Sequence, residues 1–88
     1  MNTTLNTLQN ITTATTTVVA TSGHVILHCI TFNGASVGAT TIQDASAVVY
    51  ATIAAGAIGT YWYKGVIPNG LSIVTAGASN ITVSYSKM

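Results

Sequence analysis

Charged residues are nearly absent from this sequence. Of its 88 residues only Asp44, Lys64 and Lys87 carry a full charge, which is 3% of the chain and gives a formal net charge of +1. An ordinary soluble domain has about a quarter of its residues charged. The shortage excludes a basic patch for nucleic-acid binding and leaves few groups for acid–base catalysis. It favours a surface that lies against other protein.

Cysteine and long apolar runs are scarce as well. Cys29 is the only cysteine, so a disulfide within the chain is impossible. The longest apolar stretches, Val25–Ile30 and Val48–Ile58, contain polar residues or glycine and fall well short of the ~20 residues of a membrane-spanning helix. No membrane partner is therefore predicted. A domain of this size has a thin core and usually adds disulfides, a metal or partner subunits, so we expect oligomerisation.

Threonine is abundant where charge is missing. It occurs in runs such as Thr12-Thr13, Thr15-Thr16-Thr17 and Thr40-Thr41, and its β-branched side chain favours strands. Short β-like runs separated by turn signals recur about every ten residues. They cover residues 15–21, 24–32, 39–44, 47–53, 60–64, 71–76 and 81–86. The pattern predicts an all-β fold, a small antiparallel β-sandwich of jelly-roll type with about seven to eight strands.

Alternation along these runs predicts which side chains face inward. Period-two spacing places Ile81, Val83 and Tyr85 on one face, and likewise Val49, Ala51 and Ile53. The run at 24–32 is apolar on both faces, with Ile26, Ile30 and Phe32 on one and Val25, Leu27 and Cys29 on the other. Only one face of a strand can meet the core of its own domain. We therefore expect Val25 and Leu27 to need cover from the edge of the second sheet, the N-terminal residues or a partner.

The first residues differ from the rest of the chain. Residues 1–13 are rich in Asn, Thr and Gln, with Leu5, Leu8 and Ile11 spaced by three. These are weak helix formers and no capping pattern frames them. We interpret residues 1–13 as an N-terminal arm and residues 14–88 as the β-sandwich domain. The three apolar side chains of the arm are candidate contacts across a subunit boundary.

The candidate groups for chemistry are few and separated. His24 and His28 lie four residues apart on a strand, about 13 Å, which no single ion bridges. Cys29 points away from His28, has apolar neighbours and is interpreted as a buried structural cysteine. Asp44, followed by Ala45 and Ser46, is interpreted as a turn residue. We predict no metal, no cofactor and no enzymatic activity, with His28 as a buried, hydrogen-bonded ring.

An aromatic cluster, Tyr61-Trp62-Tyr63, is the most informative local feature. Alternation places Tyr61 and Tyr63 on one face of a strand and Trp62 on the other. Three interpretations remain open: core packing, a protein interface and a platform on which a sugar stacks.

Six segments in order resemble a known group of proteins. They are GHVILHCITFN at 23–33, TTIQD at 40–44, VVYATI at 48–53, GTYWY at 59–63, NGLSIVTA at 69–76 and NITVSY at 80–85. Together they resemble the small Thr/Gly/Ala-rich all-β virion proteins encoded among the structural genes of tailed bacteriophages. The resemblance covers residues from about 15 to 86 and leaves the N-terminal arm unmatched.

The resemblance implies a capsid decoration (cement) protein that binds and stabilises the capsid exterior as a homotrimer. Its expected location is the virion, on the capsid surface, and its expected partners are its own copies and the major capsid protein or another virion protein. The alternatives are a phage neck, tail or fibre accessory subunit, or a carbohydrate-binding module. Such virion proteins have no catalytic residues. The candidate interface residues are Leu5, Leu8, Ile11, Val25, Leu27, Tyr61, Trp62 and Tyr63.

Overall fold

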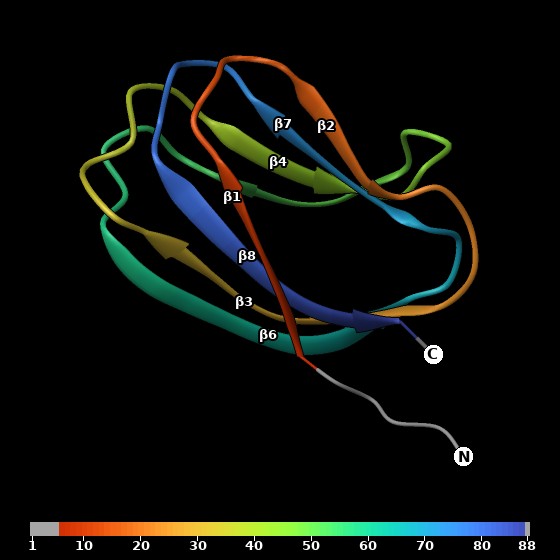
Figure 1. Cartoon of the computed structure of the whole chain (residues 1–88). Helices are drawn as coiled ribbons and strands as arrows, with labels where there is room; N and C mark the ends of the chain where they lie inside the picture. The colour runs from red at the N-terminus through yellow and green to blue at the C-terminus, as the bar shows by residue number, and fades with distance from the viewer. Residues whose placement is uncertain (1–5, 88) are drawn as a thin grey trace.

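The computed structural model describes residues 6–87, which fold into two stacked antiparallel sheets (Figure 1). The eight strands of these residues are β1 (Thr7–Ile11), β2 (Thr16–Ala20), β3 (Val25–Phe32), β4 (Thr40–Gln43), β5 (Val49–Ile53), β6 (Gly59–Ile67), β7 (Leu71–Thr75) and β8 (Ile81–Lys87). Nothing in this part of the chain forms a helix long and apolar enough to cross a membrane.

The strand order is that of a jelly roll. The first sheet has the order β1-β8-β3-β6 and the second β2-β7-β4-β5. β1 pairs with β8, β2 with β7, β3 with β6 and β4 with β5, as in one long hairpin rolled up so that its two halves stack. The predicted all-β sandwich of jelly-roll type is confirmed. The seven strands expected from the sequence correspond to β2 through β8.

The eighth strand lies inside the segment interpreted as an arm. β1 pairs with β8 from Thr7 opposite Tyr85 to Ile11 opposite Ile81. Leu8 faces outward and is exposed, whereas Ile11 is buried in the core. In its described part, the segment 1–13 is therefore an edge strand of the first sheet. The sequence did not predict this strand, because its apolar side chains are spaced by three and do not alternate. The strand needs no alternation, since only Ile11 has to face inward.

A bulge in β3 changes which of its side chains face the core. Leu27 pairs with Tyr85 and Cys29 with Ser84, so His28 is an extra residue in β3 relative to β8. An extra residue reverses the alternation of the side chains that follow it. The inward set is consequently Val25, Leu27, Ile30 and Phe32, all buried. Val25 and Leu27 therefore lie in the core of their own chain, and of the three sources of cover expected for them a partner is not needed.

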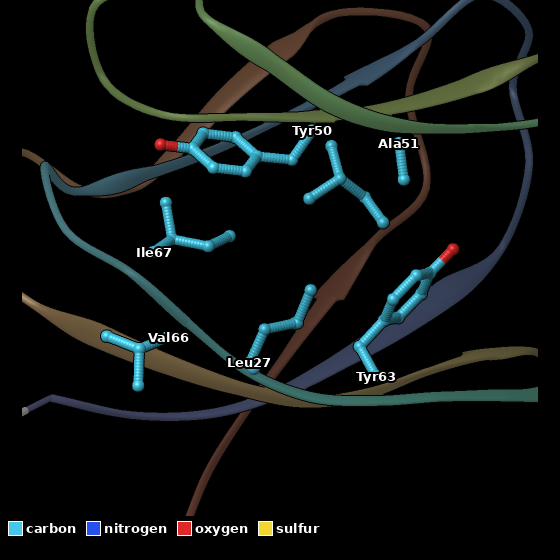
Figure 2. A pocket seen from close by; sticks show the side chains of 8 residues that line it. Leu27, Tyr50, Ala51, Tyr63, Val66 and Ile67 are labelled. Atoms are coloured by element: carbon cyan, nitrogen blue, oxygen red, sulfur yellow. The ribbon is translucent and has the colours of Figure 1, made fainter.

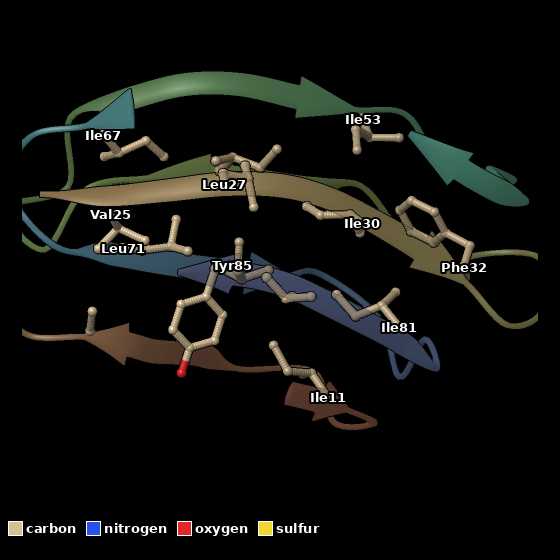
Figure 3. Close-up of a cluster of buried hydrophobic side chains, with 14 of the residues drawn as sticks. Ile11, Val25, Leu27, Ile30, Phe32, Ile53, Ile67, Leu71, Ile81 and Tyr85 are labelled. Carbon is tan, nitrogen blue, oxygen red and sulfur yellow. The ribbon is translucent and has the colours of Figure 1, made fainter. Parts of the chain in front are cut away.

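The core fills the space between the two sheets (Figure 3). Each of the eight strands contributes at least one buried apolar side chain, and β3, β7 and β8 contribute more than one. Its buried members are Ile11, Ala20, Val25, Leu27, Ile30, Phe32, Ile42, Ile53, Ala57, Ile67, Leu71, Ile73, Ile81, Val83 and Tyr85. The fully buried side chains cluster on β3, β7, β8 and β4, which are the inner strands of the two sheets.

One turn at the end of the sandwich requires glycine. Gly70 follows Pro68 and Asn69 between β6 and β7 and has a φ of 76°. A Cβ atom at this position would lie 2.6 Å from the carbonyl oxygen of Ala20 and 2.8 Å from the Cβ of Ala45. Both the backbone angle and the close approach therefore exclude a larger residue.

Candidate functional site

The side of the sandwich formed by β5 and β6 carries most of the exposed large apolar side chains. β6 is an edge strand of the first sheet and β5 of the second, and within residues 6–87 each has a strand on one side only. We call these strands and their flanking loops the β5/β6 side. Its exposed large apolar residues are Val48, Val49, Tyr50, Ile58, Tyr61, Trp62, Tyr63 and Val66. Elsewhere in residues 6–87 only Leu8, Val18 and Val37 are large, apolar and exposed.

An apolar cavity opens on this side between the two sheets (Figure 2). It has a volume of about 160 Å³ and is lined by Leu27, Ile42, Tyr50, Ala51, Tyr63, Gly65, Val66 and Ile67. We call this cavity the slot. Figure 2 shows Tyr50 and Ala51 on one side of it and Tyr63 on the other. None of the lining residues is charged.

A bulge interrupts β6 beside the slot. Trp62 and Gly65 both pair with β3, and between them Tyr63 and Lys64 together face the single residue His28. Lys64 has a φ of 52°, in the left-handed region that residues other than glycine seldom adopt. Bulges and edge lysines both hinder a second chain from extending a sheet. The β5/β6 side is thus better suited to side-chain contacts than to the addition of a strand.

The cluster Tyr61-Trp62-Tyr63 divides between the two faces of β6, as alternation predicts. Tyr61 packs edge-on against Phe32, with ring centroids 5.5 Å apart, and Tyr63 lines the slot. Trp62 lies on the outer face of the first sheet and is 66% exposed. The Lys64 Nζ atom is 5.8 Å from the centroid of the Trp62 ring, within the range of a cation–π contact.

The Tyr63 hydroxyl is held in its neutral form. Burial raises the pKa of Tyr63 above its ordinary value of 10.0, and the neighbouring Tyr61 raises this pKa further. Both effects oppose the appearance of a negative charge beside the slot. Near neutral pH the Tyr63 side chain, which lines the slot, therefore carries an uncharged hydroxyl that can donate or accept a hydrogen bond.

A second hollow, larger in volume than the slot, lies on the outer face of the first sheet. Its lining residues are Asn6, Leu8, His28, Cys29, Thr31, Asn33, Trp62, Thr82 and Ser84. Several of its polar side chains already bond to one another. Ser84 Oγ donates to Asn6 Oδ1 at 2.7 Å, and Asn33 Nδ2 donates to Thr82 Oγ1 at 3.2 Å. These groups are therefore paired among themselves.

The titratable residues are dispersed and locally paired. His28 is half-buried, with its Nε2 atom 2.9 Å from Ser86 Oγ, and Asp44 Oδ1 accepts two backbone N–H bonds of its own turn at 2.8 and 3.0 Å. Cys29 is buried and His24 is exposed. The described part of the chain contains no group of three or more His, Cys, Asp or Glu residues that could hold a metal ion.

The structure places seven of the eight predicted interface residues, and these seven fall into two groups. Ile11, Val25 and Leu27 are buried in the core of their own chain, so they are corrected to core residues. Leu5 lies outside the described residues. The other four are exposed, and three of them, Tyr61, Trp62 and Tyr63, lie together on the β5/β6 side; the fourth, Leu8, lies on β1.

Sequence reasoning missed the contribution of β5 to this surface. Opposite β4, Ala51 pairs with Ile42 and Val49 with Gln43, which leaves Tyr50 as an extra residue. This bulge turns Val49 outward, so its predicted inward orientation is wrong, and it places Tyr50 at the slot. One signal was present: Val48, Val49 and Tyr50 follow one another, and strict alternation can bury only part of such a run.

Comparison with known proteins gives a match in fold only. No family model matches this chain, and no curated protein matches it. Solved structures do match, among them the Drosophila NLP core, with a TM-score of 0.59 and 10% sequence identity. The match covers 94% of this chain and 97% of that one. At this identity it establishes the fold and leaves function to be argued from the site.

This match also corrects the function predicted from the sequence. The NLP core is described in terms of pentamer formation and histone binding, and it is not a phage protein. The predicted capsid decoration protein, with its alternatives of a neck, tail or fibre subunit or a carbohydrate-binding module, is contradicted. What this chain shares with the NLP core is a β-sandwich fold.

Proposed function

We propose that this protein is a non-catalytic structural subunit that associates with copies of itself through the β5/β6 side. The observation that carries the proposal is the gathering of exposed large apolar side chains on that side, around an open apolar slot. Contiguous exposed apolar surface of this kind marks an interaction site in soluble proteins. Aromatic residues such as Tyr and Trp are also the residues most enriched where binding energy concentrates.

Charge supports a second copy as the partner. The β5/β6 side has one exposed charged side chain, Lys64, because Asp44 in the loop before β5 is buried, and the whole chain has a formal net charge of +1. Copies with so little charge repel one another weakly. A standard interface buries about 800 Å² per partner, roughly a sixth of the 4524 Å² that this chain exposes. A surface of that size fits on one side of the sandwich.

The matched fold is also one that assembles. The NLP core is described as forming a pentamer, which supports self-association of this chain. The homotrimer implied by the phage resemblance is not retained. Its histone binding is not proposed here. Histones are basic, and the single acidic side chain of this protein, Asp44, is buried and accepts hydrogen bonds from its own turn.

The absence of a catalytic role is part of the proposal. General acid–base chemistry requires titratable groups that converge on one position. In residues 6–87 the His28 ring bonds to Ser86, Asp44 closes a turn and His24 is exposed elsewhere. Nucleic-acid binding is likewise not proposed, because Lys64 and Lys87 are the only cationic side chains that could neutralise phosphates.

Sedimentation equilibrium across the micromolar range tests the proposal. We expect discrete assemblies whose stability changes little with salt, because few ion pairs are available for screening. Val66 on β6 and Val18 on β2 form a matched pair, each 51% exposed. Val66→Asp should weaken association about 100-fold or more, since an unpaired buried charge costs roughly 3 kcal/mol or more.

Val18→Asp serves as the control and should leave association unchanged. A wild-type protein that remains monomeric at all concentrations would show that the proposal is wrong. Equal effects of the two substitutions would move the interface away from the β5/β6 side.

A further inference from the structure

We infer that the slot receives the Trp62 side chain of a second copy of this chain. The inference rests on the self-association proposed above and specifies the contact that makes it. It joins two observations on one side of the molecule: an open apolar slot and a large aromatic side chain left in solvent. The partner is a second copy, because each copy presents both the slot and the ring.

The slot has the size and chemistry to hold one aromatic ring system. Its volume is about 160 Å³, and apolar cavities of roughly 150 Å³ in proteins take up benzene-sized ligands. Core side chains Leu27, Ile42 and Ile67 form part of its wall, so an inserted ring would contact the core directly. The Tyr50 and Tyr63 side chains also line it and supply hydroxyl groups that can accept the indole N–H.

Trp62 is the residue that fits this slot best. It is the only tryptophan of the chain and the most exposed of its aromatic side chains in residues 6–87, at 66%. An isolated, solvent-exposed tryptophan leaves a large apolar area in water, and its burial against apolar surface is favourable. Lys64, whose Nζ atom lies 5.8 Å from the Trp62 ring, stays at the rim because its long stem can bend toward water.

The structure also disfavours the competing mode of contact through β6. A second copy could pair its backbone with the free edge of β6 and extend the first sheet. The two-for-one bulge at Tyr63 and Lys64, together with the left-handed φ of 52° at Lys64, breaks the regular row of backbone groups that such pairing needs. Insertion of a side chain between the sheets needs no such row.

The fluorescence of the wild-type protein gives a direct test. Because the chain has one tryptophan, all indole emission reports on Trp62. We expect emission typical of a water-exposed indole at concentrations where the protein is monomeric, and a shift to shorter wavelength as assemblies form. If assemblies form while Trp62 keeps the emission of an exposed indole, the inference is wrong and the proposed self-association stands. If no assembly forms, both are wrong.

A pair of complementary variants makes the test specific to the slot. Trp62→Ala removes the inserted ring and keeps the slot, and we expect association to weaken about 30-fold or more, the loss typical of a central interface tryptophan. Ala51→Phe fills the slot from within the chain and keeps Trp62. Each variant alone should be defective, whereas a mixture should form one-to-one complexes, because one intact slot then meets one intact Trp62.

Leu8→Ala is the matched control. Leu8 is 65% exposed on the same outer face of the first sheet, but on β1 at the opposite edge. This substitution should leave both association and the emission shift unchanged. A mixture that fails to associate, with both variants folded by circular dichroism, would overturn the inference. So would free indole that occupies the slot without disturbing the assemblies, because the slot would then be a site for a small ring compound.

Discussion

The two open sides of this sandwich are built from different residues. The side formed by β1, β2 and the connection 12–15 between them, the β1/β2 side, is rich in threonine and asparagine. There the hydroxyl of Thr75 donates to the Thr13 carbonyl and accepts from the Thr15 N–H at 3.2 Å. These two bonds hold the connection between β1 and β2 against β7. The β5/β6 side instead opens into the slot, lined by apolar and tyrosine side chains.

The difference separates two physical roles. Hydroxyl and amide groups can be satisfied within one chain or by water. The β1/β2 side therefore needs less cover from a partner, since Leu8 and Val18 are its only large apolar side chains that are exposed within residues 6–87. Exposed apolar side chains cannot be satisfied by hydrogen bonds to water or to their own chain. They lose their contact with water only when another surface covers them. We therefore expect damage to the β1/β2 side to lower the free energy of unfolding, and damage to the β5/β6 side to weaken assembly.

The largest effect on the β1/β2 side is expected from Ile11→Ala. Ile11 is 4% exposed and is the inward apolar anchor of β1 on the core. Truncation of a buried isoleucine should lower the free energy of unfolding by about 3 kcal/mol, measured by urea denaturation. Leu8→Ala on the same strand, where the side chain is exposed, should change it by less than about 0.5 kcal/mol. Equal, small effects would mean that β1 contributes nothing to the fold and would restore the interpretation of these residues as an arm.

Thr75→Val should have an intermediate effect. Thr75 is buried, and valine would keep its shape while leaving the Thr13 carbonyl and the Thr15 N–H without their side-chain partner. We expect a loss of about 1–2 kcal/mol in the free energy of unfolding. The matched substitution Thr16→Val, at an exposed position of β2, should be nearly neutral. Association constants of both variants should equal that of the wild type; a weakened assembly would place this side in the interface as well.

The smallest effect is expected from the pH dependence of Tyr63 on the β5/β6 side. The folded chain raises the pKa of this phenol above 10.0, so above pH 10 the unfolded chain loses its proton first. The unfolded state then binds fewer protons, and the free energy of unfolding falls as pH rises. Below pH 10 this contribution is constant. Tyr63→Phe should reduce the slope of stability against pH above 10 in denaturation experiments, and an unchanged slope would show that burial does not restrain this group.

Much of the fold could be predicted from the sequence, because most strands show alternating inward and outward side chains and are separated by clear turn signals. Ile81, Val83 and Tyr85 face the core as predicted, and Asp44 closes its turn as predicted. The seven runs of β-branched residues became strands β2 to β8. β1 was not predicted as a strand, because an edge strand needs few inward apolar residues. The polar remainder of its sequence is also compatible with an extended arm.

The candidate site could be predicted only in part, because β-bulges determine which of its side chains face outward. One extra residue at His28, one at Tyr50 and one in the pair Tyr63–Lys64 each alter which side chains face outward. These residue types carry no local signal for a bulge, as a glycine in a strand would. The aromatic cluster on β6 was recognised as a candidate interface, whereas Val25 and Leu27 were assigned to the wrong face for this reason.

The pairing of β1 with β8 sets the order in which this molecule can be completed during synthesis. β1 leaves the ribosome before its partner β8 has been translated. In the same way, β2 is made before its partner β7. Waiting strands that expose apolar edges are prone to aggregate. Between residues 6 and 17, Leu8 and Ile11 are the only large apolar side chains, so water can solvate this segment during the delay. The polar composition of this segment thus suits an unfinished polypeptide that still lacks β8 as well as the edge of a finished sheet.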